Sequence, residues 1–189
     1  MNFLAHLYLS QHNEDLQLGN FIADWVKGKN ILNYPQTIQA GIIMHRKIDS
    51  FTDCHPIVHN SKLRFRDIYG KYAGVFVDVL YDHFLAKNWK TYSNIELTKF
   101  ASNFYLLATK KYNFLPERIK FFLPHLIFSN RLVEYKSLEG FEKSIQIMEM
   151  RTSLPEHSFK ALELVRQDYL ELELEFETFF EEIKKTISC

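Results

Sequence analysis

Residues 41–56, GIIMHRKIDSFTDCHP, combine a helical repeat of apolar residues with a cluster of ionisable side chains. In a helix, His45, Asp49 and Asp53 follow one another at i, i+4 and i+8 and therefore lie close to one face. An imidazole and two carboxylates on one face can hold a divalent metal ion. Taken alone, the same spacing also fits a solvated helix face with one His–Asp pair.

An apolar stripe runs beside these side chains in the same predicted helix. Met44, Ile48 and Phe51 form the stripe, so the polar face borders the core instead of lying opposite it. Pro35 suits the first turn of the helix, and Pro56 ends or bends it. We therefore expect a long helix whose ionisable side chains lie at the edge of the core.

The rest of the chain also favours helices. Gly (6) and Pro (5) are scarce, hydrophobic residues make up 47%, aromatic residues 15% and charged residues 24% of the chain. A chain of 189 residues suits one domain with a substantial core. We predict an all-α fold, a single-domain helical bundle over residues 1–189. Its further helices are expected after Asn2 and over residues 16–28, 57–69, 75–89, 94–112, 117–135, 138–152 and from around 155 onward.

Three details of these helices are expected from local signals. Asp15 is the predicted N-cap of the helix over residues 16–28, and Pro124 the predicted break in the helix over residues 117–135. A short heptad-like seam in the last helix fits packing inside the chain better than a dimer zipper. The seam has apolar residues at spacings of three and four: Leu162, Val165, Tyr169, Leu172, Phe176, Phe179 and Ile183.

Charge and cysteine content limit the possible partners. Lys plus Arg and Asp plus Glu number 23 each, so the overall charge does not favour nucleic acid or an anionic membrane as a partner. Cys54 and Cys189 offer neither a disulfide framework nor zinc-finger spacing. No secretory signal and no apolar run of about 18 residues is present. We expect a cytoplasmic protein.

Further metal-type ligands occur in other predicted helices. They are His6, Asp24 and the group Asp78, Asp82 and His83. Inward-facing His and carboxylate side chains of neighbouring helices can converge on one or two ions. Each also has an ordinary interpretation: His6 as a core histidine, Asp24 as a surface acid, and the two helix acids as members of a structural ion-pair network.

The ligand types indicate the chemistry of such a site. Imidazole plus carboxylate without thiolate suits manganese, iron, zinc or magnesium. Such an ion makes hydrolysis of a phosphoester feasible near neutral pH, and Arg46 can hold a phosphate oxygen bidentately. No GxGxxG, Walker-type, GxSxG or HExxH pattern is present. Cys54 beside His55 is a poor nucleophile–base pair because adjacent helical residues point about 100° apart.

Five motifs carry a resemblance to a known family. NFLAH at 2–6, GNFIADWVKG at 19–28, GIIMHRKIDSFTD at 41–53, VDVLYDHFLAKNW at 77–89 and SNRLVEY at 129–135 resemble the acyl carrier protein phosphodiesterase family. The resemblance implies an all-helical, cytoplasmic, manganese-dependent phosphodiesterase. It would remove 4′-phosphopantetheine from the serine of holo acyl carrier protein, a step connected with fatty acid biosynthesis. It also implies a distant, distorted relative of the His–Asp (HD) phosphohydrolases, here with the doublet reversed.

The resemblance further implies roles for individual residues. Asp24 would orient or deprotonate the attacking water, and Arg46 would neutralise charge on the equatorial phosphate oxygens together with the ion. Tyr8 stands where some relatives have another histidine. The implied catalytic residues are Asp24, His45 and Arg46, and the implied metal ligands are His6, Asp24, His45, Asp49, Asp82 and His83.

The implied substrate is an acidic protein, so a locally basic docking face is expected on this neutral chain. Its candidates are Lys62, Arg64, Arg66 and Lys71, with Lys27 and Lys29 near Asp24; the alternative is a solvated face. Two other functions stay open: a metal-dependent phosphohydrolase of the same build acting on a nucleotide or another small phosphoester, and a non-catalytic helical binding module.

Overall fold

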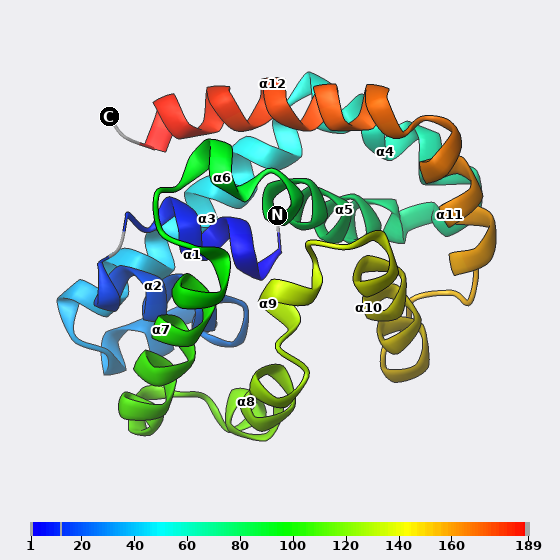
Figure 1. The fold of residues 1–189 in the computed structure, drawn as a ribbon. Coiled ribbons are helices and arrows are strands. Elements are labelled where there is room, and N and C mark those ends of the chain that lie inside the picture. Colours follow the sequence, from blue (N-terminus) through cyan, green and yellow to red (C-terminus); the bar gives the residue numbers. More distant parts are fainter. Residues whose placement is uncertain (1, 12, 188–189) are drawn as a thin grey trace.

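The computed structural model describes residues 2–11 and 13–187, and within them the chain is helical with no strand (Figure 1). The predicted all-α class is confirmed. His12 and Cys189 lie outside the described residues. The α-helices are α1 (Phe3–Leu9), α2 (Glu14–Ile22), α3 (Gln36–Cys54), α4 (Pro56–Tyr69), α5 (Ala73–Lys87), α6 (Trp89–Tyr92), α7 (Leu97–Lys110), α8 (Glu117–Phe128), α9 (Arg131–Glu134), α10 (Leu138–Arg151), α11 (Ser158–Gln167) and α12 (Tyr169–Ile187). Short 3₁₀ turns are η1 (Ala23–Trp25), η2 (Gly28–Asn33), η3 (Gly70–Tyr72) and η4 (Tyr112–Phe114).

The start and end of α2 differ from the prediction. Asn13, not Asp15, caps the helix, because its side-chain oxygen accepts hydrogen bonds from the N–H groups of Asp15 and Leu16. The Asp15 carboxylate instead accepts from Thr37. The helix ends at Ile22, and the following residues form the tighter turn η1. Asp24 therefore lies on η1, beyond the end of α2.

Two other predicted helices are divided elsewhere than expected. Pro124 lies inside α8, and the break comes at Asn130, whose φ of 44° and ψ of 41° are left-handed. Asparagine tolerates this conformation better than most residues. The last predicted helix is two helices, α11 and α12, separated at Asp168.

α5 occupies the middle of the molecule. It packs against α1, α4, α10 and α12, and α12 runs along one side, at the top of Figure 1. The predicted seam faces this core: all its members on α11 and α12 except the partly buried Tyr169 are buried within the chain, so intramolecular packing is confirmed. Each buried Phe or Leu contributes about 1.5–3 kcal/mol of transfer free energy.

α2 and α3 pack backbone against backbone. Gly19 and Gly41 face each other: a Cβ added to Gly19 would overlap the carbonyl oxygen of Ile38 and lie 2.9 Å from Gly41 Cα. A Cβ on Gly41 would lie 2.5 Å from the carbonyl oxygen of Leu16. Only glycine permits this approach, which brings the polar end of α2 against the middle of α3.

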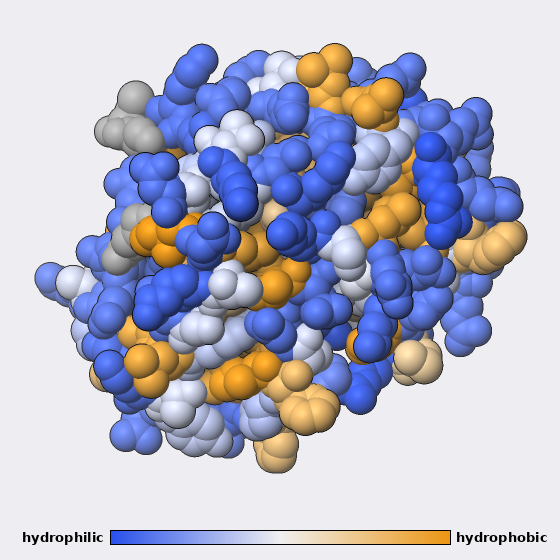
Figure 2. All heavy atoms as spheres, viewed as in Figure 1, coloured by the Kyte–Doolittle hydropathy of each residue, from blue (hydrophilic) through white to orange (hydrophobic). Residues whose placement is uncertain are grey.

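The surface seen in Figure 2 is mostly hydrophilic, with small separate hydrophobic groups. Among the described residues, no helix is both long enough and apolar enough to cross a membrane.

Candidate metal centre

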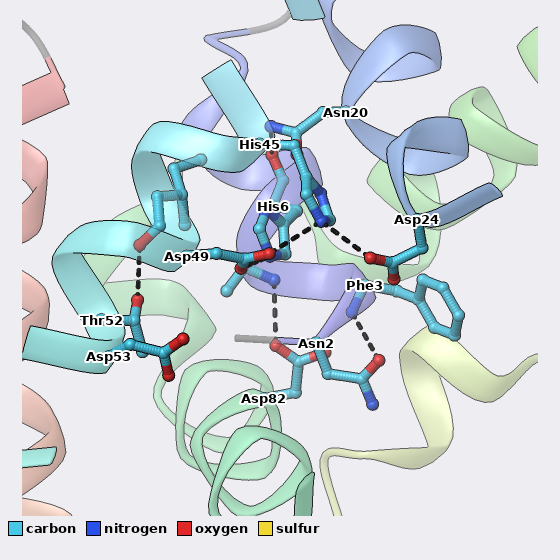
Figure 3. A network of polar contacts seen from close by, with 12 residues as sticks. Asn2, Phe3, His6, Asn20, Asp24, His45, Asp49, Thr52, Asp53 and Asp82 are labelled. Atoms are coloured by element: carbon cyan, nitrogen blue, oxygen red, sulfur yellow. Dashed lines mark hydrogen bonds and ion pairs between the residues drawn. The ribbon is translucent and has the colours of Figure 1, made fainter. Parts of the chain in front are cut away.

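His45 is held from both ends of its ring (Figure 3). Its Nδ1 lies 3.1 Å from Asn20 Oδ1, and since an amide oxygen only accepts, Nδ1–H is the donor. Its Nε2 lies 3.0 Å from Asp49 Oδ2 and 3.2 Å from Asp24 Oδ1. An outer hydrogen bond of this kind orients a histidine whose other nitrogen serves as a ligand.

His6 reaches the same carboxylate from α1. Its Nε2 lies 3.2 Å from Asp49 Oδ1, and its ring stacks on that of His45 with centroids 4.1 Å apart. The Asn20 amide donates to the backbone carbonyl of His6 at 2.9 Å and to Ser10 Oγ at 3.1 Å. One buried amide of α2 therefore positions both α1 and the His45 ring.

These side chains make a compact group of possible ligands. One ligand atom from each of His6, His45 and Asp49 lies within 4.8 Å of the other two, and Asp24 adjoins them through His45. Both histidines are buried, whereas Asp49 is partly exposed and Asp24 exposed. Two imidazoles and carboxylates without thiolate suit manganese, iron, zinc or magnesium. The group can hold a divalent cation and leaves one side open to solvent at Asp24.

The protonation states favour a cation at this place. Burial opposes a charge on His45, but the hydrogen bonds with Asp24 and Asp49 outweigh it and raise the pKa of His45 to about 9. Burial lowers the pKa of His6 to about 4. Although burial acts to raise the pKa of Asp49, hydrogen bonds from both histidines hold it well below the usual range, and the hydrogen bond with His45 lowers the pKa of Asp24. Near neutral pH His45 therefore carries a proton on Nε2, the nitrogen that would bind a metal ion.

Asp82 lies outside the group and holds α1 in place. Its Oδ2 accepts the N–H of Leu4 at 2.8 Å and its Oδ1 accepts the N–H of Ala5 at 3.0 Å. Burial raises the pKa of Asp82 to about 7 against these bonds. Both oxygens thus pair with N–H groups at the start of the helix that carries His6, so the expectation of Asp82 as a metal ligand gives way to a positioning role.

The structure does not bring His83 to the group either. Its Nδ1 donates to the carbonyl of Tyr135 at 2.7 Å, and its Nε2 accepts from the hydroxyl of Tyr169 at 2.7 Å. Burial lowers the pKa of His83, which fits a neutral ring with one donor and one acceptor. His83 follows Asp82 on α5 and therefore points about 100° away from it, toward α9 and α12. Its expected place among the ligands is corrected to a structural one.

The remaining members of the 41–56 stretch have other partners. Asp53 accepts from Lys62 at 2.8 Å, and His55 Nε2 lies 3.0 Å from Glu182. Arg46 is exposed and donates to the carbonyl of Val26, which is near Asp24 in sequence, at 3.1 Å. Its guanidinium carries further N–H groups that can donate to a ligand.

Part of the expected docking face is neutralised by acids of the same chain. Lys62 pairs with Asp53, and Arg64 contacts three carboxylates of the C-terminal part, from Asp168, Glu171 and Glu175, at 2.9, 3.1 and 2.8 Å. Arg66 and Lys71 are exposed. The basic stretch of α4 therefore presents less net positive charge than its sequence suggests.

Asn20 is the site residue that sequence reasoning missed. It is fully buried and precedes Asp24 by four positions. A signal was present, since an amide among the apolar residues of α2 needs a buried partner. What the sequence lacked was the partner, because His45 is 25 residues away.

The fold and this group define a class: an all-helical protein with a candidate metal centre of two histidines and carboxylates contributed by α1, α3 and η1. Residues 1–183 match the acyl carrier protein phosphodiesterase family, and the chain belongs to it.

Curated relatives agree with this membership. The chain is 45% identical to the acyl carrier protein phosphodiesterase of Yersinia pestis over 89 residues. These 89 residues cover 47% of this chain and 46% of the relative. Proteins of the same name from Photorhabdus laumondii, at 43% over 89 residues (47% and 45%), and an Escherichia coli O45:K1 strain, at 42% over 93 residues (49% and 48%), are also similar. The matched stretch spans about half the length of these relatives. No solved structure shows significant similarity to the chain.

Proposed function

We propose that this protein hydrolyses the phosphodiester that links 4′-phosphopantetheine to a serine of acyl carrier protein, with manganese as its metal ion. The observation that carries the proposal is the convergence of His6, His45 and Asp49 beside Asp24. Family membership and the name of the relatives, acyl carrier protein phosphodiesterase, suggest the substrate. The whole chain, residues 1–189, acts as one helical phosphodiesterase domain in this proposal.

His6, His45 and Asp49 would hold the ion, with Asp24 as a further ligand or neighbour. When bound, it supplies Lewis acidity toward a phosphoryl oxygen and lowers the pKa of a water molecule. Manganese is compatible with both carboxylate and imidazole ligands. The chain's own contribution is to keep Asp24 and Asp49 ionised through their hydrogen bonds with the histidines, and to keep His6 neutral by burial.

Asp24 and Arg46 act on the substrate from the open side. Asp24 is ionised and exposed, so it can orient the attacking water and accept its proton. Arg46 donates to Val26, and its remaining N–H groups stabilise negative charge on the phosphate oxygens. Cleavage of the serine O–P bond releases 4′-phosphopantetheine and leaves apo acyl carrier protein.

Docking of an acidic carrier protein needs positive charge near this opening. Lys27 and Lys29 are exposed just after Asp24, and with Arg66 and Lys71 they remain the candidate docking residues. Binding of this kind weakens as salt concentration rises. The exposed Cys54 thiol is compatible with the reducing cytoplasm as the place of action.

The test incubates the protein with holo acyl carrier protein and manganese and follows the carrier by intact mass. Loss of the phosphopantetheine mass is expected, with apo carrier protein as a blank. Asp24→Ala and His45→Ala should abolish the reaction while circular dichroism shows unchanged helicity. Unchanged activity in either folded variant would sink the site assignment. If the protein hydrolyses small phosphoesters but leaves the carrier protein unchanged, a phosphohydrolase of the same build acting on a nucleotide or another small phosphoester is favoured. If the protein binds no metal and catalyses neither reaction, a non-catalytic helical binding module is favoured.

A further inference from the structure

A pocket of about 410 Å³ lies beside Asp24, between α1, η1, α8, α9 and α10. Its volume is within the range of small-molecule sites. Much of its wall is apolar, contributed by Phe3, Trp25, Phe122, Ile147 and Met148. Phe3 stacks on Trp25 with centroids 6.4 Å apart and also packs against Phe122 at 5.7 Å.

The same pocket is lined by three basic side chains, Arg131, Arg151 and His125. Arg131 is 5% exposed, and no carboxylate of the described residues forms an ion pair with it. Within the described chain, Arg131 Nη2 and His125 Nε2 are buried atoms without a hydrogen-bond partner. Burial, helped by the nearby charges of Arg151 and Arg131, lowers the pKa of His125. A buried guanidinium with an unused donor is costly, which indicates an oxygen-bearing ligand as its partner.

Local structure fixes the position of Arg131. It begins α9 directly after the left-handed Asn130. Tyr105 Oη accepts the N–H of Leu132 at 3.3 Å, and Asn2 donates to Tyr135 Oη at 3.1 Å. The SNRLVEY segment, residues 129–135, is therefore tied to the first residues of the chain and to α7. The pocket is preformed, and the arginine does not need to move far to meet a ligand.

The pocket meets the candidate metal centre at one residue. Asp24 lines the pocket and also lies 3.2 Å from His45 Nε2. A substrate whose phosphate lies at the metal centre can therefore extend its adjoining chain past Asp24 into this pocket.

We propose that this pocket binds the phosphopantetheine arm of the substrate, with Arg131 and Arg151 donating to phosphate or amide oxygens of the arm and the aromatic wall packing on its methyl and methylene groups. This inference rests on the proposed function, since it assigns the substrate of that reaction. The arm combines a phosphate, two amides and an aliphatic chain, which matches a wall with both cations and apolar surface. Arg131, Arg151 and Met148 are substrate-positioning residues that set affinity for the arm.

The experiment titrates free 4′-phosphopantetheine into the manganese-loaded protein by calorimetry, with pantetheine and inorganic phosphate as separate probes. Arg131→Gln and Arg151→Gln should each weaken 4′-phosphopantetheine binding about 10-fold, in the range of one charge-assisted hydrogen bond. Met148→Trp should fill the pocket and abolish binding of pantetheine. Arg118→Gln, an exposed arginine of α8 outside the pocket, is the matched control and should bind like the wild type.

The outcomes separate the pocket from the reaction. Arg131 is buried, so its variant can fail to fold. In that case the Arg151→Gln and Met148→Trp variants test the pocket, because Arg151 is exposed and Met148 only partly buried. If the wild type hydrolyses holo acyl carrier protein but the pocket variants keep its KM and the affinity for the free arm, the pocket assignment is overturned while the function stands. If the wild type does not hydrolyse the carrier but binds the arm in a manner that depends on Arg151 and Met148, the pocket is supported and the function fails. Equal binding of inorganic phosphate with none of pantetheine overturns the pocket as the site of the arm.

Discussion

The contact between Gly19 and Gly41 permits a quantitative prediction. A methyl group at Gly19 would overlap the carbonyl oxygen of Ile38 and lie 2.9 Å from Gly41 Cα and 3.0 Å from Ile42 N. These neighbours are backbone atoms, so no side-chain rotation relieves the contact, and α2 must move away from α3. Overpacking of this kind costs about 1–3 kcal/mol, and forced backbone movement costs more. The helix-propensity gain of Gly→Ala offsets about 1 kcal/mol of that.

We therefore expect Gly19→Ala to lower the free energy of unfolding by about 1–3 kcal/mol. Movement of α2 also lengthens the contact of 3.1 Å between His45 Nδ1 and Asn20 Oδ1, so manganese affinity should fall as well. Urea unfolding followed by circular dichroism measures the first effect, and calorimetric titration with manganese measures the second.

Gly74→Ala is the matched control. It also replaces a glycine in a helix, but the new Cβ meets only the end of a flexible side chain, at 3.3 Å from Lys62 Cε. Its stability should equal or exceed that of the wild type by up to about 1 kcal/mol. If Gly19→Ala matches Gly74→Ala in stability and binds manganese like the wild type, the close packing of α2 on α3 is not what builds the site.

Three further predictions concern the candidate metal centre. Manganese binding near neutral pH should release about one proton from His45, because the proton and the ion compete for its Nε2. Manganese affinity should therefore rise with pH and level off above the His45 pKa of about 9. Calorimetry in buffers of different ionisation enthalpy measures both effects. Asn20→Ala should weaken manganese binding about 10- to 100-fold, whereas Asn103→Ala, an exposed amide on α7, should leave it unchanged. His83→Phe should leave manganese binding intact but lower the free energy of unfolding by about 1–3 kcal/mol in thermal unfolding. The reason is that the Tyr135 carbonyl and the Tyr169 hydroxyl lose their hydrogen-bond partner on the ring. Loss of manganese binding in this variant would show that His83 is a metal ligand.

Local sequence patterns were enough to predict much of the fold and the central residues of the candidate metal centre. Scarce Gly and Pro with helical apolar repeats were enough to predict the helical class and most helices. The spacing of His45 and Asp49 placed them one turn apart on one face, and that relation persists because it depends on helix geometry alone. Their ligand chemistry also singled out His6 and Asp24, and the motif resemblance implied roles for both; the structure places them beside His45 and Asp49.

Tertiary packing decided which neighbours each face meets. Asp82 and His83 are adjacent in sequence, yet one holds α1 and the other joins Tyr135 and Tyr169, because consecutive helical residues point in different directions. Asn20 became a site residue only through a glycine contact that brings α2 onto α3. Side-chain chemistry and helical period are local and can be read from the sequence, whereas the partner of a buried polar group depends on contacts between residues far apart in the chain.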